Sequence, residues 1–232
     1  MHATERMAAM RLSYAGAGLS EADLARDWLT QFQRWFDDAT ASGMTEPNAM
    51  VVATVSRRGI VSARSVLAKH VDDRGVVFFT HYTSAKSRDL SENPHVAITF
   101  PWYDLHRQVH FRGIATKVPR ADTVAYWSER PRGSQIGSTA SPQSTVMHGR
   151  AELDALQAAV ARRYGGMDGD ADEALPIPAP ADWGGWRVRP VVVEFWQGRT
   201  DRLHDRLRFR RADGEADGTA TDGDWIVERL AP

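Results

Sequence analysis

The chain has 232 residues and a formal net charge of −1, with 42% hydrophobic and 25% charged residues, a composition typical of a globular protein. This balance gives no polycationic surface for nucleic acid, and no stretch approaches the about 20 apolar residues that span a membrane. Cysteine is absent, which excludes disulfides and thiolate chemistry. The N-terminus has no apolar signal-peptide core, so we expect a cytoplasmic protein.

The first regular element predicted is a helix over residues 27–43. Apolar side chains from Leu29 to Ala39 recur at spacings of three and four, and Gly43 is a natural stop. Residues 1–26, which precede this helix, are interpreted as an N-terminal arm.

After the helix, the hydrophobic period changes to two, which is typical of β-strands. Turn sequences at 56–59 and 72–75, each rich in charged residues and ending in glycine, separate the first strands. Short strands joined by hairpin-length turns predict an antiparallel sheet that curls into a barrel. The predicted strands are 49–55, 60–67, 76–80, 95–100 and 108–118.

The second half of the chain begins with two predicted helices, at 120–129 and 151–164. A segment rich in Gly, Asp and Pro follows at about 165–183 and is interpreted as a mobile loop. Only three short strands come after it, at 191–196, 207–211 and 225–230. Because three short strands cannot bury a core of their own, we expect them to complete the first sheet. The predicted fold is mainly β (β-rich α+β), one domain over 27–232 with peripheral helices.

The run from Arg202 to Arg210 alternates in character, since every even position is Arg or His. On a strand this pattern gives a basic face and a mostly apolar face that carries Leu203 and Phe209. The basic face fits an anion-binding site, because guanidinium groups match phosphate oxygens. It also fits a charged edge strand that prevents aggregation, and the pattern alone leaves both interpretations open.

Other cations stand at the ends of predicted strands. Arg64 and Lys69 flank an apolar segment, and strict alternation places them on opposite faces unless a bulge intervenes. Lys86 follows a strand and several hydroxyl residues where a short helix is expected to begin, which is an acceptable phosphate cradle.

A hydroxyl, a guanidinium and a second hydroxyl recur every four residues at Tyr126, Arg130 and Ser134. A continuous helix would place them on one face, but Pro131 argues that the helix breaks. Elsewhere, His106 and His110 have no third ligand at metal-binding spacing, so no metal site is predicted.

Longer motifs run in order from about Arg11 to Pro232. They are RSVLAK (64–69), VFFT (77–80), FPW (100–102), RQV (107–109), SERPRGSQIG (128–137), QS (143–144), WGG (183–185), EFWQG (194–198), RLHDR (202–206) and RLAP (229–232). With these motifs the chain resembles the pyridoxamine 5′-phosphate oxidase family, whose fold is an antiparallel split barrel that binds flavin mononucleotide (FMN).

The resemblance implies a homodimer with FMN bound at the subunit interface. It implies that the flavin is held by Arg64, Ser65, Val66, Leu67, Lys69, Phe79, Thr80, Lys86, Gln108, Gln143, Ser144, Trp196 and Arg206. For the substrate it implies contacts from Arg11, Tyr14, Lys69, Tyr126, Arg130, Ser134 and Leu203, with Arg202 and His204 as the catalytic pair facing the pyridine ring. Residues 1–26 would then form a lid.

The implied reaction oxidises pyridoxamine or pyridoxine 5′-phosphate to pyridoxal 5′-phosphate, with dioxygen as acceptor and hydrogen peroxide as product. Ala85 departs from the family pattern, because many relatives carry a second arginine there. Two alternatives remain: a split-barrel reductase that uses a deazaflavin, and a non-catalytic protein that binds flavin or pyridoxal phosphate. The six substrate-side residues Lys69, Tyr126, Arg130, Ser134, Arg202 and His204 argue against the reductase.

Overall fold

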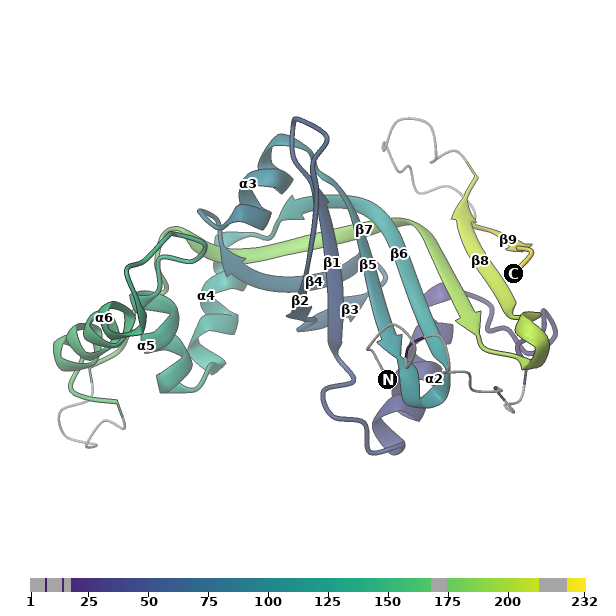
Figure 1. The fold of residues 1–232 in the computed structure, drawn as a ribbon, viewed down its shortest axis with the longest axis horizontal. Helices are drawn as coiled ribbons and strands as arrows, with labels where there is room; N and C mark the ends of the chain where they lie inside the picture. Colours follow the sequence, from purple (N-terminus) through teal and green to yellow (C-terminus); the bar gives the residue numbers. More distant parts are fainter. Residues whose placement is uncertain (1–6, 8–13, 15–17, 168–174, 213–224) are drawn as a thin grey trace.

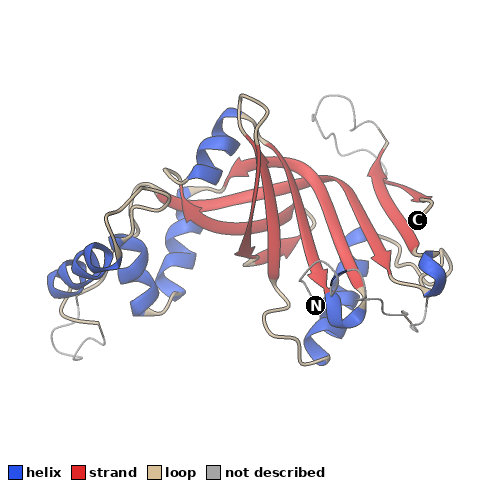
Figure 2. Cartoon of the chain, viewed as in Figure 1, coloured by secondary structure: helices blue, strands red, loops and turns tan. Residues whose placement is uncertain are grey.

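The computed structural model describes residues 7, 14, 18–167, 175–212 and 225–232. Within them, a single nine-stranded sheet curls around the core, and the helices lie at its periphery (Figures 1 and 2). Its path is β2-β1-β5-β6-β7-β4-β3, with β8 paired to β7 and β9 to β8, and all these pairs are antiparallel. This is the curled antiparallel sheet predicted from the sequence.

The elements follow one another along the chain as predicted, with some additions. The strands are β1 (Ala49–Val55), β2 (Val61–Leu67), β3 (His70–Asp72), β4 (Gly75–His81), β5 (His95–Trp102), β6 (Arg107–Lys117), β7 (Trp183–Gln197), β8 (Asp205–Arg211) and β9 (Trp225–Arg229). The helices are α2 (Trp28–Ala41), α3 (Ala85–Glu92), α4 (Arg120–Glu129), α5 (Arg132–Ala140) and α6 (Arg150–Arg163), with short 3-10 turns η1 (Tyr103–Leu105) and η2 (Thr200–Arg202).

Helix α2 packs on the core of the sheet. Asp27 caps its start, because Oδ1 accepts a hydrogen bond from Thr30 N at 2.8 Å. The buried face of the helix carries Phe32, whose ring lies 5.0 Å from Phe100 on β5 and 5.7 Å from Phe111 on β6. Burying a large apolar side chain of this kind stabilises the fold by about 1.5–3 kcal/mol. The apolar residues that recur with helical spacing in the sequence are therefore the ones that contact the sheet.

Strand β7 is far longer than predicted. The sequence indicated a strand only at 191–196, whereas β7 begins at Trp183, where the expected loop was thought to end. Its pairing with β6 shifts register, because Arg112 faces Val192 while Gly113 faces Pro190. Val191 is therefore an extra residue in a β-bulge, and the bulge breaks the alternation that marks a strand.

The C-terminal strands extend the same sheet. β8 pairs with the second half of β7, and β9 pairs with β8, as the sequence led us to expect. A second, smaller apolar cluster lies under α4, α5 and α6 and includes Trp127, Ile136 and Trp183. Trp183, the first residue of β7, thus anchors the peripheral helices to the sheet. Among the described residues, no helix is long and apolar enough to cross a membrane.

Candidate active site

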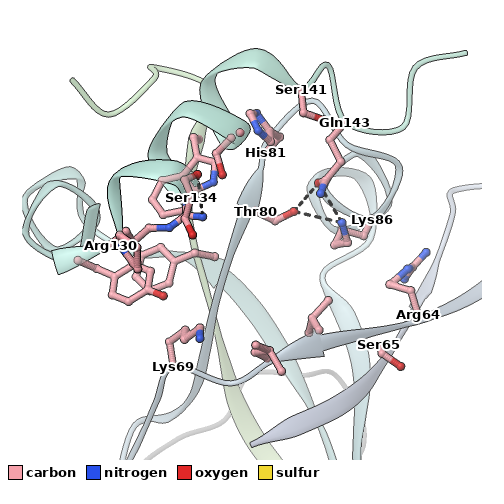
Figure 3. Close-up of a pocket in the computed structure, with 18 of the residues that line it drawn as sticks. Arg64, Ser65, Lys69, Thr80, His81, Lys86, Arg130, Ser134, Ser141 and Gln143 are labelled. Carbon is pink, nitrogen blue, oxygen red and sulfur yellow. Dashed lines mark hydrogen bonds between the residues drawn. The ribbon is translucent and has the colours of Figure 1, made fainter. Parts of the chain in front are cut away.

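A cavity of about 770 Å³ opens between the sheet and helices α3, α4 and α5 (Figure 3). The residues around it come from β2, β4, three helices and the start of β7. They are Arg64, Ser65, Val66, Leu67, Lys69, Phe79, Thr80, His81, Lys86, Tyr126, Glu129, Arg130, Pro131, Ser134, Gly137, Ser138, Ser141, Gln143 and Trp183.

One side of the cavity carries Lys86 and Arg64 (Figure 3). The ammonium of Lys86 donates to Thr80 Oγ1 and to Gln143 Oε1, both at 3.1 Å, and Thr80 Oγ1 donates to Gln143 Oε1 at 2.7 Å. Burial, and to a smaller extent the nearby charge of Arg64, lower the pKa of Lys86 to about 8. An anion bound beside this buried ammonium would stabilise its charged form.

The other side of the cavity carries Arg130, Ser134 and Lys69 (Figure 3). The Arg130 guanidinium lies over the ring of Trp183 at 4.7 Å, and its buried Nη1 has no hydrogen-bond partner among the described residues. Burial lowers the pKa of Arg130. Nearby, Tyr126 stacks on Phe79 with 4.1 Å between ring centroids.

The helix break at Pro131 does not scatter the predicted triplet. Helix α4 ends at Glu129 and α5 begins at Arg132, yet Tyr126, Arg130 and Ser134 all line the cavity. The sequence did not predict α5 as a helix. Arg130 Nη2 donates to Ser134 O at 3.3 Å, which ties the two helices together at the break.

Arg64 and Lys69 line the same cavity, so the strict alternation that would place them on opposite faces does not extend to Lys69. Strand β2 ends at Leu67, and the chain then changes partner strands. Ala68 N donates to Asn48 O, beside β1, whereas Lys69 N donates to Val77 O on β4. The alternation therefore stops before Lys69, and the turn brings its side chain back to the cavity.

The four cations of the cavity share one property. Arg64, Lys69, Lys86 and Arg130 form no ion pair with any carboxylate of the described residues, although Glu129 also lines the cavity. Lys86 is buried, Arg64 and Arg130 are half-buried and Lys69 is exposed, and removing a cation from water without a counter-charge is costly. Grouped on two sides of one cavity, they suit a ligand, or two ligands, with two separate anionic groups.

A second group of predicted site residues lies at the far end of β7. Gln108, Trp196 and Arg206 are direct partners across β6, β7 and β8, so their side chains share one face of the sheet. Glu194 fixes the Arg206 guanidinium through two hydrogen bonds, Nε to Oε1 at 2.7 Å and Nη2 to Oε2 at 3.1 Å.

Arg202 does not lie on a strand, which corrects the alternation inferred from the sequence. It ends the turn η2 with a left-handed φ of 61°, and β8 begins only at Asp205. From Arg206 onward the alternation holds, with Leu207 and Phe209 buried. Leu203 is 71% exposed and belongs to neither face.

The remaining arginines of this run are paired. Arg208 Nε lies 2.7 Å and Arg210 Nη2 3.0 Å from the carboxylate of Glu228 on β9. These two members of the basic run therefore belong to a cross-strand ion-pair cluster with β9.

His204 and Tyr14 join this second group. The His204 ring lies 4.7 Å from that of Trp196, and its Nδ1 accepts a hydrogen bond from Arg199 N at 3.1 Å. Tyr14 lies 5.9 Å from His204, and it borders a separate small cavity of about 220 Å³ together with Gln108 and Trp196. Arg11 lies outside the described residues.

The two groups lie at opposite ends of β7. Figure 1 shows this strand running from the α4–α6 end of the molecule to β8. Trp183 opens the strand and lines the large cavity, while Trp196 stands one residue before its end. At about 3.3 Å per residue, roughly 40 Å of strand separates them. Within one chain, none of Gln108, Trp196 and Arg206 lines the large cavity.

Some residues differ from the sequence prediction. Ser144 is exposed and does not line the cavity, although its neighbour Gln143 does. His81, Ser138 and Ser141 line it without having been predicted. Position next to predicted residues was the only available signal for them. The described residues contain no cluster of His, Asp and Glu suited to a metal ion.

The curled antiparallel sheet with peripheral helices is a split barrel, and its fold matches a solved structure of a pyridoxamine 5′-phosphate oxidase-related, FMN-binding protein from Nostoc punctiforme. That similarity has a TM-score of 0.66 at 16% identity over 90% of this chain and 98% of that one, and concerns the fold alone. The structure of PhzG from Burkholderia lata, in complex with tetrahydrophenazine-1-carboxylic acid, is more similar. It gives a TM-score of 0.81 at 29% identity over 95% of this chain and all of that one.

The chain belongs to the pyridoxamine 5′-phosphate oxidase family and is an oxidoreductase. Residues 36–164 match the family described as pyridoxamine 5′-phosphate oxidase, and 183–232 match its C-terminal dimerisation region. A pyridoxine/pyridoxamine 5′-phosphate oxidase of Salinispora arenicola is 50% identical over 96% of this chain and 95% of its own length. One of the same name from Saccharopolyspora erythraea is 49% identical over 99% and 96%.

Proposed function

We propose that the protein oxidises pyridoxamine 5′-phosphate, pyridoxine 5′-phosphate or both to pyridoxal 5′-phosphate, with FMN as cofactor, dioxygen as acceptor and hydrogen peroxide as product. The observation that carries this proposal is the single cavity with cations on two sides that lack protein counter-charges. Two phosphate monoesters, one on the flavin and one on the substrate, account for both sides. The names of the relatives that are about half identical support the same reaction.

The side with Arg64 and Lys86 fits the flavin phosphate. Lys86 is buried and donates to Thr80 and Gln143, and the half-buried Arg64 is held by Thr54 and the carbonyl of Val52. The residues proposed to hold FMN are Arg64, Ser65, Val66, Leu67, Lys69, Phe79, Thr80, Lys86, Gln108, Gln143, Ser144, Trp196 and Arg206. When bound, the flavin supplies the redox chemistry, and the protein supplies position and charge.

The side with Arg130 fits the substrate phosphate. Lys69, Tyr126 and Ser134 surround the cavity with it, and the unpartnered Nη1 of Arg130 offers a donor that a phosphate oxygen can satisfy. A carboxylate ligand has fewer acceptor oxygens to meet these groups, so the four side chains together favour a phosphate ester.

A homodimer would bring the separated groups together. Gln108, Trp196 and Arg206 of one subunit would complete the flavin site in the cavity of the other, since they do not line the cavity of their own subunit. The match of residues 183–232 to a dimerisation region supports this arrangement, because that region carries Trp196 and Arg206.

Arg202 and His204 are proposed to face the substrate ring, with Leu203, Tyr14 and Arg11 around it. Because Nδ1 of His204 accepts from Arg199 N, the neutral imidazole carries its proton on Nε2. His204 can therefore donate a hydrogen bond to the substrate, while Arg202 adds a permanent positive charge. The proposed catalytic roles are thus to orient the ring and to stabilise negative charge on it.

The test is to purify the protein, identify any yellow ligand, and measure peroxide release with each phosphorylated substrate. A colourless protein that FMN cannot reconstitute would overturn the proposal. A deazaflavin reductase would turn over without peroxide, and a non-catalytic carrier would bind both ligands without turnover.

A further inference from the structure

Arg64 is held from behind by a chain of side chains that ends on helix α3. Its Nη1 donates to Thr54 Oγ1 at 2.7 Å and to Val52 O at 3.3 Å. Thr54 Oγ1 in turn lies 2.6 Å from Asp89 Oδ2. These hydrogen bonds thus join the hairpin of β1 and β2 to helix α3, which follows some twenty residues later.

The chemistry of the groups fixes the direction of this chain. A guanidinium only donates hydrogen bonds and an ionised carboxylate only accepts them, so the Thr54 hydroxyl accepts from Arg64 and donates its single proton to Asp89. Thr54 is 0% exposed, so water cannot replace either partner. The orientation of the hydroxyl is therefore set by Asp89, and the orientation of Arg64 is set by the hydroxyl.

The anchoring uses one nitrogen of the guanidinium and leaves the others for a ligand. Nε and Nη2 of Arg64 have no acceptor among the described residues, and Arg64 lines the cavity close to Lys86 (Figure 3). Burial lowers the pKa of Arg64, and the charge of Asp89 acts in the opposite direction. Asp89 thus supports the charged state of Arg64 without occupying its Nε and Nη2.

Helix α3 serves the same site twice. Lys86 and Asp89 stand three residues apart and so lie on neighbouring positions of one helix face. One of them points its ammonium at Thr80 and Gln143, and the other points its carboxylate at Thr54. A shift of α3 would therefore disturb both cations on this side of the cavity together.

We propose that Thr54 and Asp89 are positioning residues for the flavin phosphate. They hold the Arg64 guanidinium in the orientation in which its remaining N–H groups meet the phosphate oxygens. Neither residue touches the ligand, and both act through Arg64. This inference rests on the proposed FMN-dependent function and assigns two residues to it that do not line the cavity.

The first test compares FMN with riboflavin, which lacks the phosphate. Thr54→Val keeps the shape of the side chain and removes both hydrogen bonds, whereas Thr54→Ser keeps the hydroxyl. Binding to the apo-protein is followed by quenching of flavin fluorescence. We expect Thr54→Val to weaken FMN binding about tenfold and to leave riboflavin binding unchanged. Thr54→Ser should bind both flavins like the unchanged protein.

The second test acts at the other end of the chain. Asp89→Asn keeps an acceptor for the Thr54 proton and should preserve FMN binding, whereas Asp89→Leu removes the acceptor and should weaken it. If Thr54→Val lowers Tm so far that the apo-protein does not fold, the comparison of Asp89→Asn with Asp89→Leu tests the proposal in its place.

Two results would overturn the inference. Equal losses of affinity for FMN and riboflavin would mean that the Arg64–Thr54–Asp89 hydrogen bonds only hold α3 in place. Unchanged FMN affinity in Thr54→Val would mean that Arg64 keeps its orientation without Thr54. If the unchanged protein binds neither flavin, the proposed function itself fails. That outcome differs from one in which the unchanged protein binds FMN and Thr54→Val binds it equally well, which would overturn only this inference.

Discussion

The ring of Tyr14 lies on the ring of His106, with 4.2 Å between their centroids. Gly198, just beyond β7, makes room for this contact, because a Cβ there would lie 2.7 Å from Tyr14 Cδ2. Gly198 N also donates to His106 O at 2.8 Å. His106 has a left-handed φ of 51°, a conformation that asparagine adopts more easily than most residues. Tyr14 is therefore placed beside Trp196 and His204 by a preformed platform.

Loss of this platform is expected to weaken substrate binding and leave the flavin in place. In Gly198→Ala the new methyl group displaces the Tyr14 ring, and in His106→Asn the ring that Tyr14 contacts is gone while the backbone conformation is kept. Because an aromatic pair contributes about 0.5–1.5 kcal/mol, KM for pyridoxamine 5′-phosphate should rise up to about tenfold. Tyr14→Phe, which keeps the ring, serves as the control. An unchanged KM in both disruptive variants would contradict a role for Tyr14 at the substrate.

Arg202 and Arg206 are expected to fail in different ways when replaced by alanine. Arg202 is exposed at the turn η2, so Arg202→Ala should lower turnover much more than flavin occupancy. Arg206→Ala should lose flavin first. It also leaves the carboxylate of Glu194, whose side chain is 13% exposed, without its bidentate partner, at a cost of about 1–3 kcal/mol in stability.

Adding Glu194→Gln to Arg206→Ala separates the two effects. The double variant should recover Tm but not flavin content, because only the unpaired charge has been removed. Flavin content is read from the absorbance of the purified protein, and turnover is measured with added FMN. Normal flavin retention by Arg206→Ala would show that our assignment of roles is reversed.

The affinity of the apo-protein for FMN should fall as the pH rises through about 8. Burial, and then the charge of Arg64, lower the pKa of Lys86 to about 8. Above that pH the empty site must first take up a proton to bind the phosphate as an ion pair. Titrations with FMN from pH 7 to 9.5 test this. Riboflavin, which has no phosphate, and Lys86→Arg, which stays charged, should both show a flat profile.

The same shift has the opposite sign for stability. Because the folded apo-protein binds the Lys86 proton less tightly than the unfolded chain, the unfolded state carries more protons between pH of about 8 and about 10.5. The contribution of Lys86 to the free energy of unfolding should therefore increase with pH across that window. A comparison of Tm for the apo-protein and for Lys86→Gln over this range checks the sign.

Arg130→Lys is expected to impair the substrate and spare the flavin. The guanidinium lies over the rings of Trp183 and Trp127, at 4.7 and 5.2 Å, and offers a further donor to the cavity. An ammonium cannot cover two rings and also present a planar pair of donors. KM for the phosphorylated substrate should rise at least about tenfold, with FMN affinity unchanged. Arg162→Lys, on an exposed position of α6, is the matched control.

Elements with an unbroken period were predicted well from the sequence. β1 alternates strictly between half-buried and buried residues over Ala49–Val55, and α4 occupies the predicted range Arg120–Glu129. In β1 the hydrophobic pattern and the local geometry agree, and α4 ends where Pro131 stops it, so the bounds could be placed without knowledge of the tertiary structure.

The first half of β7 was missed for physical reasons. Its glycines look like a loop, but they are there because neighbours pack closely: a Cβ at Gly184 would lie 2.3 Å from the Tyr82 hydroxyl, and one at Gly185 would lie 2.7 Å from Val118 Cγ2. Pro190 and the bulge at Val191 then interrupt the alternation. Such contacts arise between distant segments and leave no periodic signal.

The candidate site was predicted in composition but not in arrangement. Most of the cavity residues were named from the family resemblance, yet alternation put Lys69 on the wrong face and placed Arg202 on a strand. The first error arises because β2 already ends at Leu67, and the second because β8 begins only at Asp205. The division of the site into two distant groups depends on the path of β7 through the sheet, which the sequence does not encode locally.

The bulge at Val191 affects which single-residue deletions β7 can tolerate. From Trp186 to Pro190 the buried residues of β7 have even numbers, and from Val193 to Gln197 they have odd numbers. The partners on β6 nevertheless follow one another without a gap, because Gly113 faces Pro190 and Arg112 faces Val192. Deleting Val191 would therefore restore regular pairing and leave Val193 and Phe195 on the core face. An in-frame loss of one codon should be tolerated better at this point than elsewhere in β7, where it would exchange the faces of all residues on one side of the deletion.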